Sequence, residues 1–67
     1  MEYNIGDMIY TPRIKKNGYI VDIDSYYVRF KYVDDPGEIY QLYLLDFENL
    51  FIDMNDGNHW KHYPIKK

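Results

Sequence analysis

The sequence predicts an all-β domain: a small barrel of about five short antiparallel strands, with one helical turn before the last strand. Two observations carry this prediction. The first 45 residues show no helical period, and short apolar runs alternate with turn signals rich in Gly, Pro, Asn and Asp. The chain has 67 residues and no cysteine. Closing the sheet into a barrel lets so short a chain remove most of its exposed strand edges.

The first expected strand is the apolar run Met8–Tyr10, which follows a Gly-Asp pair. Pro12 should end this strand or place it at an edge, because proline has no N–H to donate to the ladder. The next segment, Arg13–Gly18, reads as a basic loop that closes with an Asn-Gly turn.

The second expected strand runs from Tyr19 to Asp24. Its apolar residues Ile20 and Ile23 are three apart, whereas a regular strand repeats every two residues. One extra residue near Val21-Asp22 would return both side chains to the same face. The spacing therefore predicts a β-bulge.

The clearest strand signal lies in 26–33, and it begins a predicted hairpin. Apolar and polar residues alternate along it, and Asp34–Gly37 supplies a turn in which Pro presets φ and Gly accepts positive φ. The return strand should be Glu38–Leu45. The inward positions of the hairpin are expected to be Val28, Phe30, Tyr32, Tyr40, Leu42 and Leu44.

The last part of the chain mixes several weak signals. Asp46–Leu50 reads as one helical turn capped by Asp46, with its two large apolar residues inward, and Phe51-Ile52 as a short closing strand. Asp53–Asn58 reads as a polar turn cluster. The tail, His59–Ile65, alternates weakly and could add a sixth strand at an edge.

A chain of 67 residues makes one domain, with its core expected in about 6–52 and a C-terminal extension in 53–67. No apolar run approaches the roughly 20 residues that span a bilayer, and the N-terminus lacks the features of a signal peptide. These features favour a soluble, cytoplasmic protein without a membrane partner. The oligomeric state is left open.

Four segments resemble the Tudor-like, SH3-type barrels of bacteria. Gly6–Pro12 matches their Gly-Asp opening, Gly18–Ile23 their second strand and Val28–Phe30 their valine-x-phenylalanine strand. Leu44–Leu50 resembles the Leu-Leu-x-Phe-x-x-Leu close of the Tudor-like module at the C-terminus of bacterial repair helicases. CarD-type transcription regulators open similarly. The resemblance covers about 6–52 and implies an SH3-like barrel that docks onto RNA polymerase or other proteins.

Two segments depart from that family pattern. The loop after Pro12 carries Arg13, Lys15 and Lys16 where the family usually has an aromatic-Gly pair, and the tail after Ile52 has no recognised counterpart. The matched motifs are structural, so the resemblance implies a mode of action and transfers no specific site.

The residues that usually perform catalysis are scarce in this chain. It has no Cys, one Thr and one Ser, and Ser25 is better explained by a turn. His59 and His62, with Asp53 and Asp56 nearby, would suit a metal only on a helix, which the surrounding Gly, Asn and Pro disfavour. The acidic pairs read as solvated surface charge. We therefore expect no enzyme activity, no cofactor and no metal.

The nine tyrosines are the most informative feature for function, because a small core has room for few large rings. Several rings should lie on the surface, where Tyr, Trp and Arg dominate binding hot spots. The simpler alternative is that these rings cover Lys and Arg stems or pack beneath the tail around its tryptophan. The predicted partner-binding residues are Tyr10, Tyr19, Tyr27, Arg29, Tyr43 and Trp60.

Two function classes compete. The first is a protein-binding module, of the kind that phages and mobile elements use to bind or inhibit a host protein of transcription, replication or defence. The alternative is a barrel that binds single-stranded nucleic acid through tyrosines and through Arg13, Lys15, Lys16 and Lys31. The formal net charge of −3 counts against the alternative, since non-specific nucleic-acid binding needs a positive surface.

Overall fold

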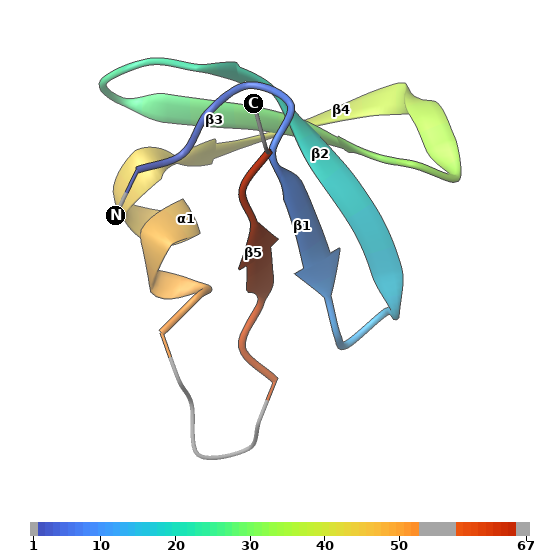
Figure 1. Cartoon of the computed structure of the whole chain (residues 1–67). Helices are drawn as coiled ribbons and strands as arrows, with labels where there is room; N and C mark the ends of the chain where they lie inside the picture. Colours follow the sequence, from blue (N-terminus) through green and yellow to red (C-terminus); the bar gives the residue numbers. More distant parts are fainter. Residues whose placement is uncertain (1, 53–57, 66–67) are drawn as a thin grey trace.

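The computed structural model describes residues 2–52 and 58–65 (Figure 1). Within them the predicted fold class is confirmed, because five antiparallel strands form one sheet and a short helix precedes the last strand. The elements in chain order are β1 (Met8–Thr11), β2 (Lys16–Ile23), β3 (Tyr27–Tyr32), β4 (Asp35–Tyr43), α1 (Leu44–Asn49) and β5 (Lys61–Tyr63).

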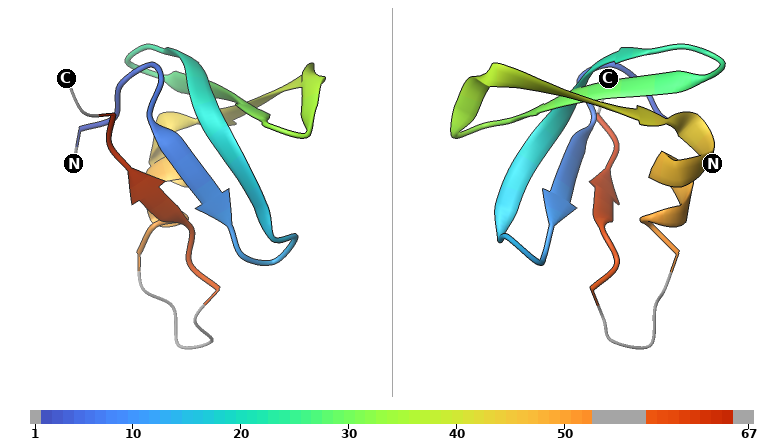
Figure 2. Two further views of the ribbon diagram at one scale, coloured as in Figure 1. Left: turned by 45° about the vertical axis from the view of Figure 1, so that its right-hand side comes forward. Right: turned by 180° about the vertical axis from the view of Figure 1, so that it is seen from behind.

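The strands lie in the order β4-β3-β2-β1-β5, and the sheet bends so strongly that its two ends face each other (Figure 2). β2 has 8 residues and pairs with β1 on one side and β3 on the other, so it belongs to both halves of the bent sheet. Helix α1 follows β4 directly and lies between the end of that strand and β5 (Figure 2). The concave side of the bent sheet holds the core, and the outer side carries the alternate side chains. In the described residues no helix is long and apolar enough to cross a membrane.

The predicted bulge in β2 is present. The register between β2 and β3 shifts between Ile20 and Asp22, and this shift turns Ile23 back to the inner side. Ile20 is fully buried and Ile23 packs against the core. The bulge increases the local twist of β2 and so helps the sheet to bend.

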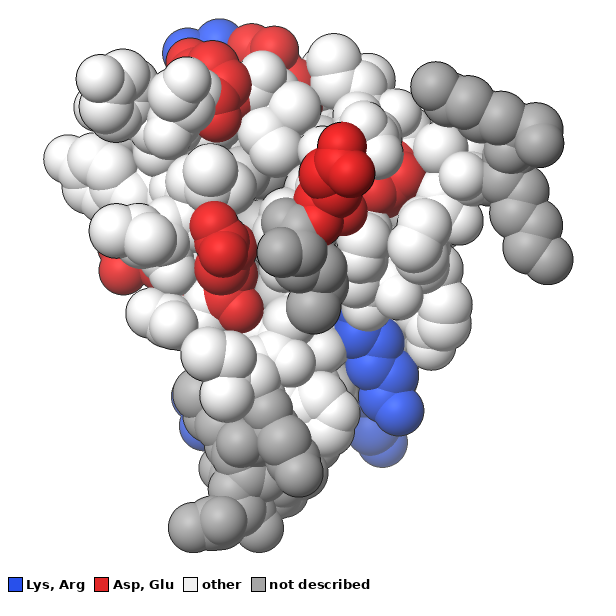
Figure 3. Space-filling view, turned by 60° about the vertical axis from the view of Figure 1, so that its left-hand side comes forward, with Lys and Arg blue, Asp and Glu red and all other residues white. Residues whose placement is uncertain are grey.

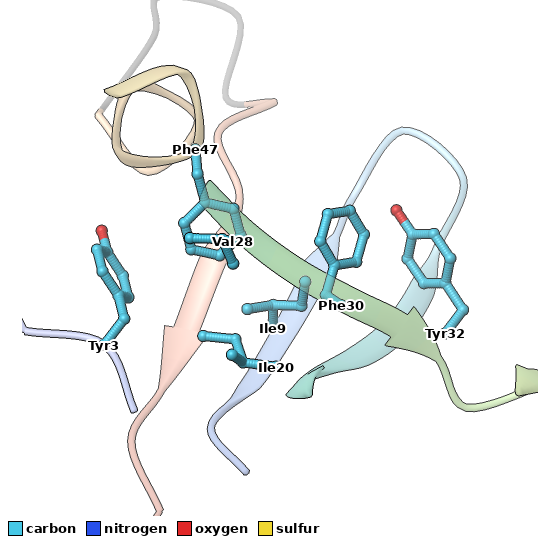
Figure 4. Close-up of a cluster of buried hydrophobic side chains, with 7 residues drawn as sticks. All are labelled: Tyr3, Ile9, Ile20, Val28, Phe30, Tyr32 and Phe47. Atoms are coloured by element: carbon cyan, nitrogen blue, oxygen red, sulfur yellow. The ribbon is translucent and has the colours of Figure 1, made fainter. Parts of the chain in front are cut away.

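The core is an aromatic-rich cluster (Figure 4). Its buried members are Tyr3, Ile9, Ile20, Val28, Phe30, Tyr32 and Phe47. The predicted inward residues Leu42 and Leu44 pack against this cluster, as expected. Tyr40 is 41% exposed, yet its ring stacks on Phe30 with centroids 5.5 Å apart. Tyr40 therefore covers the margin of the core instead of filling it.

The predicted Asn-Gly turn is wrong. Gly18 is a buried residue within β2, and the chain turns earlier, between Pro12 and Lys15, where Lys15 has a φ of 54°. A Cβ on Gly18 would lie 2.7 Å from the backbone oxygen of Lys31. Glycine is needed there because the neighbouring strand approaches closely, and not because the chain reverses.

The turn of the β3–β4 hairpin lies earlier than predicted. The chain reverses at Val33-Asp34, and Asp35 pairs with Tyr32 as the first residue of β4. An irregularity in the register follows, and it accommodates Pro36, which has no N–H for a regular ladder.

Helix α1 begins at Leu44, earlier than predicted, so Asp46 does not cap it. The N-cap residue is Tyr43, which makes no side-chain cap hydrogen bond, and Asp46 lies in the first turn. A carboxylate there still interacts favourably with the positive end of the helix dipole.

The closing strand predicted at Phe51-Ile52 is also wrong. Phe51 continues the helical path with a 3.2 Å hydrogen bond from its N–H to the Glu48 carbonyl. The last strand instead comes from the tail, where β5 pairs with β1 and is the fifth strand of the sheet, not a sixth. Most of the predicted polar turn at 53–58 lies outside the described residues.

Candidate aromatic binding surfaces

The tyrosines predicted to face outward do lie on the outer side of the sheet, but they form two separate groups. Tyr27 and Tyr43 are directly paired across β3 and β4. Tyr19 lies on β2, where it pairs with Met8 of β1 and with Lys31 of β3. Lys31 is near the opposite end of β3 from Tyr27. The single face that the sequence suggested is therefore two surfaces.

The first group, which we call the Tyr43 patch, consists of Tyr26, Tyr27, Tyr43 and Leu45. Its exposed fractions are 73% for Tyr26, 61% for Tyr43 and 76% for Leu45. The rings of Tyr27 and Tyr43 stack with centroids 5.2 Å apart and an angle of 28° between their planes. Three large apolar side chains that are more than half exposed therefore lie within one short stretch of surface.

Local hydrogen bonds hold the backbone beneath the Tyr43 patch. The carboxylate of Asp24 accepts the backbone N–H groups of Tyr26 at 2.7 Å and Tyr27 at 2.8 Å. The N–H of Leu44 donates to the Tyr26 carbonyl at 2.7 Å, which joins the start of α1 to the β2–β3 turn. The hydrogen bonds from Tyr26 and Tyr27 hold the pKa of Asp24 below its usual value.

Tyr43 stands between two shallow depressions of the surface. One is lined by Ser25, Tyr26, Tyr43, Leu44, Leu45 and Asp46. The other is lined by Tyr27, Gln41, Leu42, Tyr43 and Asp46. Side chains of a partner could enter on either side of the Tyr43 ring. The carboxylate of Asp46 borders both depressions, and it gives this surface an acidic edge.

A polar row separates the two aromatic groups. Arg29, a predicted contact residue, donates from Nε to the side-chain oxygen of Gln41 at 2.7 Å. It also lies 3.6 Å from the Asp22 carboxylate, with both side chains about half exposed. Arg29 is thus held at the edge of the Tyr43 patch by partners on both neighbouring strands.

The second group, which we call the outer row, consists of Met8, Tyr10, Tyr19 and Tyr63. Met8 lies directly opposite Tyr19 on one side and Tyr63 on the other. Tyr10 is two residues further along β1, on the same outer side. Tyr63 is 52% exposed and Met8 37% exposed, whereas Tyr10 and Tyr19 are half-buried. Met8 and Tyr63 are not among the predicted contact residues, because the sequence assigns the tail no definite partner strand.

The basic residues proposed as nucleic-acid contacts lie beside the outer row. Lys31 is the cross-strand neighbour of Tyr19, and Arg13 and Lys15 are exposed in the β1–β2 turn. Lys16 forms an ion pair with Asp34, with 3.4 Å between its Nζ and a carboxylate oxygen. The structure places all four on the half of the molecule that is remote from the Tyr43 patch.

Trp60 lies apart from both groups. Its ring packs edge-on against Phe30, Phe47 and Phe51, with centroids 5.6 to 6.4 Å apart. The backbone N–H of Trp60 donates to the Leu50 carbonyl at 2.6 Å. Trp60 therefore covers the open end of the core and belongs to neither group of tyrosines.

A buried carboxylate, which the sequence patterns do not predict, fixes the tail to the N-terminal segment. Asp7 is fully buried and accepts hydrogen bonds from the Asn4 N–H, the Ile65 N–H and Nε2 of His62, all between 2.7 and 2.9 Å. His62 is 55 residues away in sequence, so no local pattern reveals the interaction. Burial raises the pKa of Asp7, but these three hydrogen bonds outweigh it and the net pKa is lowered.

The hydrogen bond to Asp7 also bears on the metal hypothesis. His62 points inward to Asp7 and packs against Tyr3 in a tilted arrangement, with ring centroids 4.7 Å apart. Asp53 and Asp56 lie outside the described residues. Among the residues that the structure does describe, no three His, Asp or Glu side chains gather in a group that could hold a metal ion.

The lowered pKa values of Asp7 and Asp24 predict acid sensitivity. A carboxyl group whose folded pKa lies below its unfolded value stabilises the fold above about pH 4 and loses that contribution as the pH falls further. We expect the melting temperature to hold between about pH 7 and 5 and to drop below about pH 4. Asp24→Asn should keep the turn and show a smaller drop. An unchanged melting temperature down to about pH 3 would contradict this account.

Comparison with protein-family models, curated proteins and solved structures found no match for this chain. The resemblance to Tudor-like barrels therefore remains a prediction from the sequence.

Proposed function

We propose that this chain is a protein-binding module, not an enzyme, and that the Tyr43 patch is its principal contact surface. The observation that carries the proposal is the exposure of Tyr26, Tyr43 and Leu45, each more than half exposed and all within one patch. Exposed apolar side chains of this size are unfavourable in water unless a partner covers them. Tyr is also among the residues that contribute most to binding energy at interfaces.

The rigidity of the patch supports the same proposal. Tyr27 and Tyr43 hold each other by stacking, and the backbone under them is fixed by Asp24 and by the first residue of α1. A surface that is already ordered loses little conformational freedom on binding, so more of the contact energy appears as affinity. The two depressions beside Tyr43 provide places for side chains of the partner.

The proposed partner is a larger cellular protein in the cytoplasm. The chain is rich in Ile, Lys, Asn, Asp and Tyr, whose codons low-GC genomes favour. This composition and the small domain fit an accessory protein of a phage or mobile element of low-GC bacteria, and such proteins often act on transcription, replication or defence machinery. The acidic and uncharged character of the surface near α1 favours a partner whose contact surface is neutral or basic (Figure 3).

The double substitution Tyr27→Ala and Tyr43→Ala tests the patch. Hot-spot tyrosines each contribute about 2 kcal/mol or more, so the recovery of partners should fall at least about tenfold. The measurement is affinity purification from a low-GC bacterial lysate, with quantitative mass spectrometry of the proteins recovered by each variant.

Ile14→Ala is the matched control, because Ile14 is an apolar residue that is 48% exposed at the other end of β2. It should recover partners as well as the original protein does. Equal recovery by the tyrosine double variant, with its fold verified by circular dichroism, would overturn the assignment of the patch.

A further inference from the structure

The outer row combines aromatic rings with cations, in contrast to the Tyr43 patch with its acidic edge. Lys31 lies directly opposite Tyr19 on β3, and Lys61 lies directly opposite Tyr10 on β5. In the described part of the chain neither lysine forms an ion pair, and both side chains belong to the outer side of the sheet. The net charge of −3 is therefore unevenly distributed. Acidic side chains are prominent on the α1 side, where basic ones appear only at the margins (Figure 3).

We propose that the outer row is a second binding surface, and that it takes single-stranded nucleic acid. Bases would stack on Tyr10, Tyr19 and Tyr63, while Lys31 and Lys61 contact the phosphates on either side. This site shares no residue with the Tyr43 patch, so it stands or falls independently of the proposed protein partner.

The register of the sheet places the three rings as neighbours. Tyr19 and Tyr63 flank Met8 from the two adjacent strands, and Tyr10 is diagonal to both. Diagonal positions of an antiparallel sheet are about 7 to 8 Å apart at Cα, which is within reach of aromatic side chains. Successive bases of an extended strand can therefore lie on successive rings, as they do on stacking platforms of other single-strand binders.

The cations are placed to follow such a strand. Lys61 and Lys31 lie at opposite margins of the outer row, one on β5 and one on β3. A surface hollow of about 400 Å³ adjoins the row and is lined by Met8, Lys15 and Lys16 among others. Asp34 pairs with Lys16, so among the described residues beside the row the cations without an ion pair are Arg13, Lys15, Lys31 and Lys61. The ligand class follows from rings and cations together, because an acidic peptide would need only the cations.

The test uses the full chain and fluorescein-labelled oligo-dT and oligo-U as probes, with fluorescence anisotropy as the readout. We expect binding at low salt, with an affinity that falls steeply as salt rises. Tyr19→Val should weaken binding about tenfold, since each stacked base contributes substantially to the affinity. Tyr19→Phe keeps the ring and should bind the oligonucleotides like the original protein. Lys31→Gln with Lys61→Gln should make the salt dependence shallower, by about 0.7 in logarithmic slope for each phosphate that the variant no longer neutralises.

Tyr43→Ala serves as the control variant and should bind the oligonucleotides as the original protein does. Three results would overturn the proposal: no anisotropy change at low salt, equal binding by Tyr19→Val and Tyr19→Phe, or equally tight binding of polyglutamate. The last result would show that the surface selects anions without reading bases. Thermal melts of each variant separate a weaker binding surface from an unfolded protein.

Discussion

Replacing Asp7 with alanine is expected to unfold most of the protein or to lower its free energy of unfolding by about 3 kcal/mol or more. The substitution removes the acceptor for Asn4 N–H, Ile65 N–H and His62 Nε2, all of which lie in a part-buried setting. A buried donor that has lost its acceptor cannot form a hydrogen bond to water instead, so the cost of removing it from solvent is no longer compensated. The measurement is urea denaturation followed by the fluorescence of Trp60, which lies one residue before β5.

Asp24→Ala is the matched control for this prediction. Asp24 also accepts two backbone N–H groups, but it is exposed, so water replaces the missing acceptor. We expect a clearly smaller loss of stability than for Asp7→Ala. A free energy of unfolding for Asp7→Ala within about 0.5 kcal/mol of the original value would show that the buried carboxylate does not hold the tail.

Replacing Phe47 with alanine should have an effect of similar size. Phe47 is fully buried, and its ring packs on Tyr3, Phe51 and Phe30 with centroids 5.0 to 6.1 Å apart. Large-to-small changes of a buried Phe destabilise a protein by about 3 to 5 kcal/mol, because apolar surface is no longer buried and a cavity remains. A domain of this size has about that much stability in total, so the variant should be largely unfolded at room temperature.

Near-ultraviolet circular dichroism measures this prediction, because the packed rings give the protein its aromatic signal. Phe47→Leu keeps most of the buried volume and should retain a cooperative melt at a lower temperature. If Phe47→Ala melted at the same temperature as Phe47→Leu, the ring would not be the centre of the core.

The strands were predictable where one face of the sheet is buried. The alternation of Val28 and Phe30 with Arg29 defined β3, and the three-residue spacing of Ile20 and Ile23 defined the bulge. In both cases one face of the strand is buried, so the apolar residues must point to that face, and their spacing in the local sequence shows which residues these are.

The turns were less predictable, because glycine and proline have more than one structural use. Gly18 permits a close approach of two strands, and Pro36 lies at an irregularity within β4. The last strand could not be placed for another reason. β5 is three residues long, and its position depends on pairing with β1 and on the hydrogen bond between His62 and Asp7. Such long-range interactions leave no periodic signal.

The candidate site was predicted only in part, because Tyr26 and Leu45 were not among the expected contact residues and Trp60 packs on the core instead. Strand phase correctly placed Tyr19, Tyr27 and Tyr43 on the outer side of the sheet. The alternation of side chains along a strand predicts the face of the sheet on which a residue lies. It does not predict which residues of the neighbouring strands lie beside it, so the division into two surfaces became visible only from the strand pairing. The polar row of Arg29 and Gln41 between them became visible only in the paired strands.

Site-specific photo-crosslinking would show whether the Tyr43 patch touches a protein partner. A photoreactive phenylalanine analogue would replace Tyr43 in one protein and Ile14 in another, since both positions are exposed but lie at different ends of the molecule. We expect position 43 to give a discrete crosslinked protein in cells and position 14 to give none. The same crosslinked protein at both positions, or at position 14 alone, would contradict the assignment of the Tyr43 patch as the protein-binding surface.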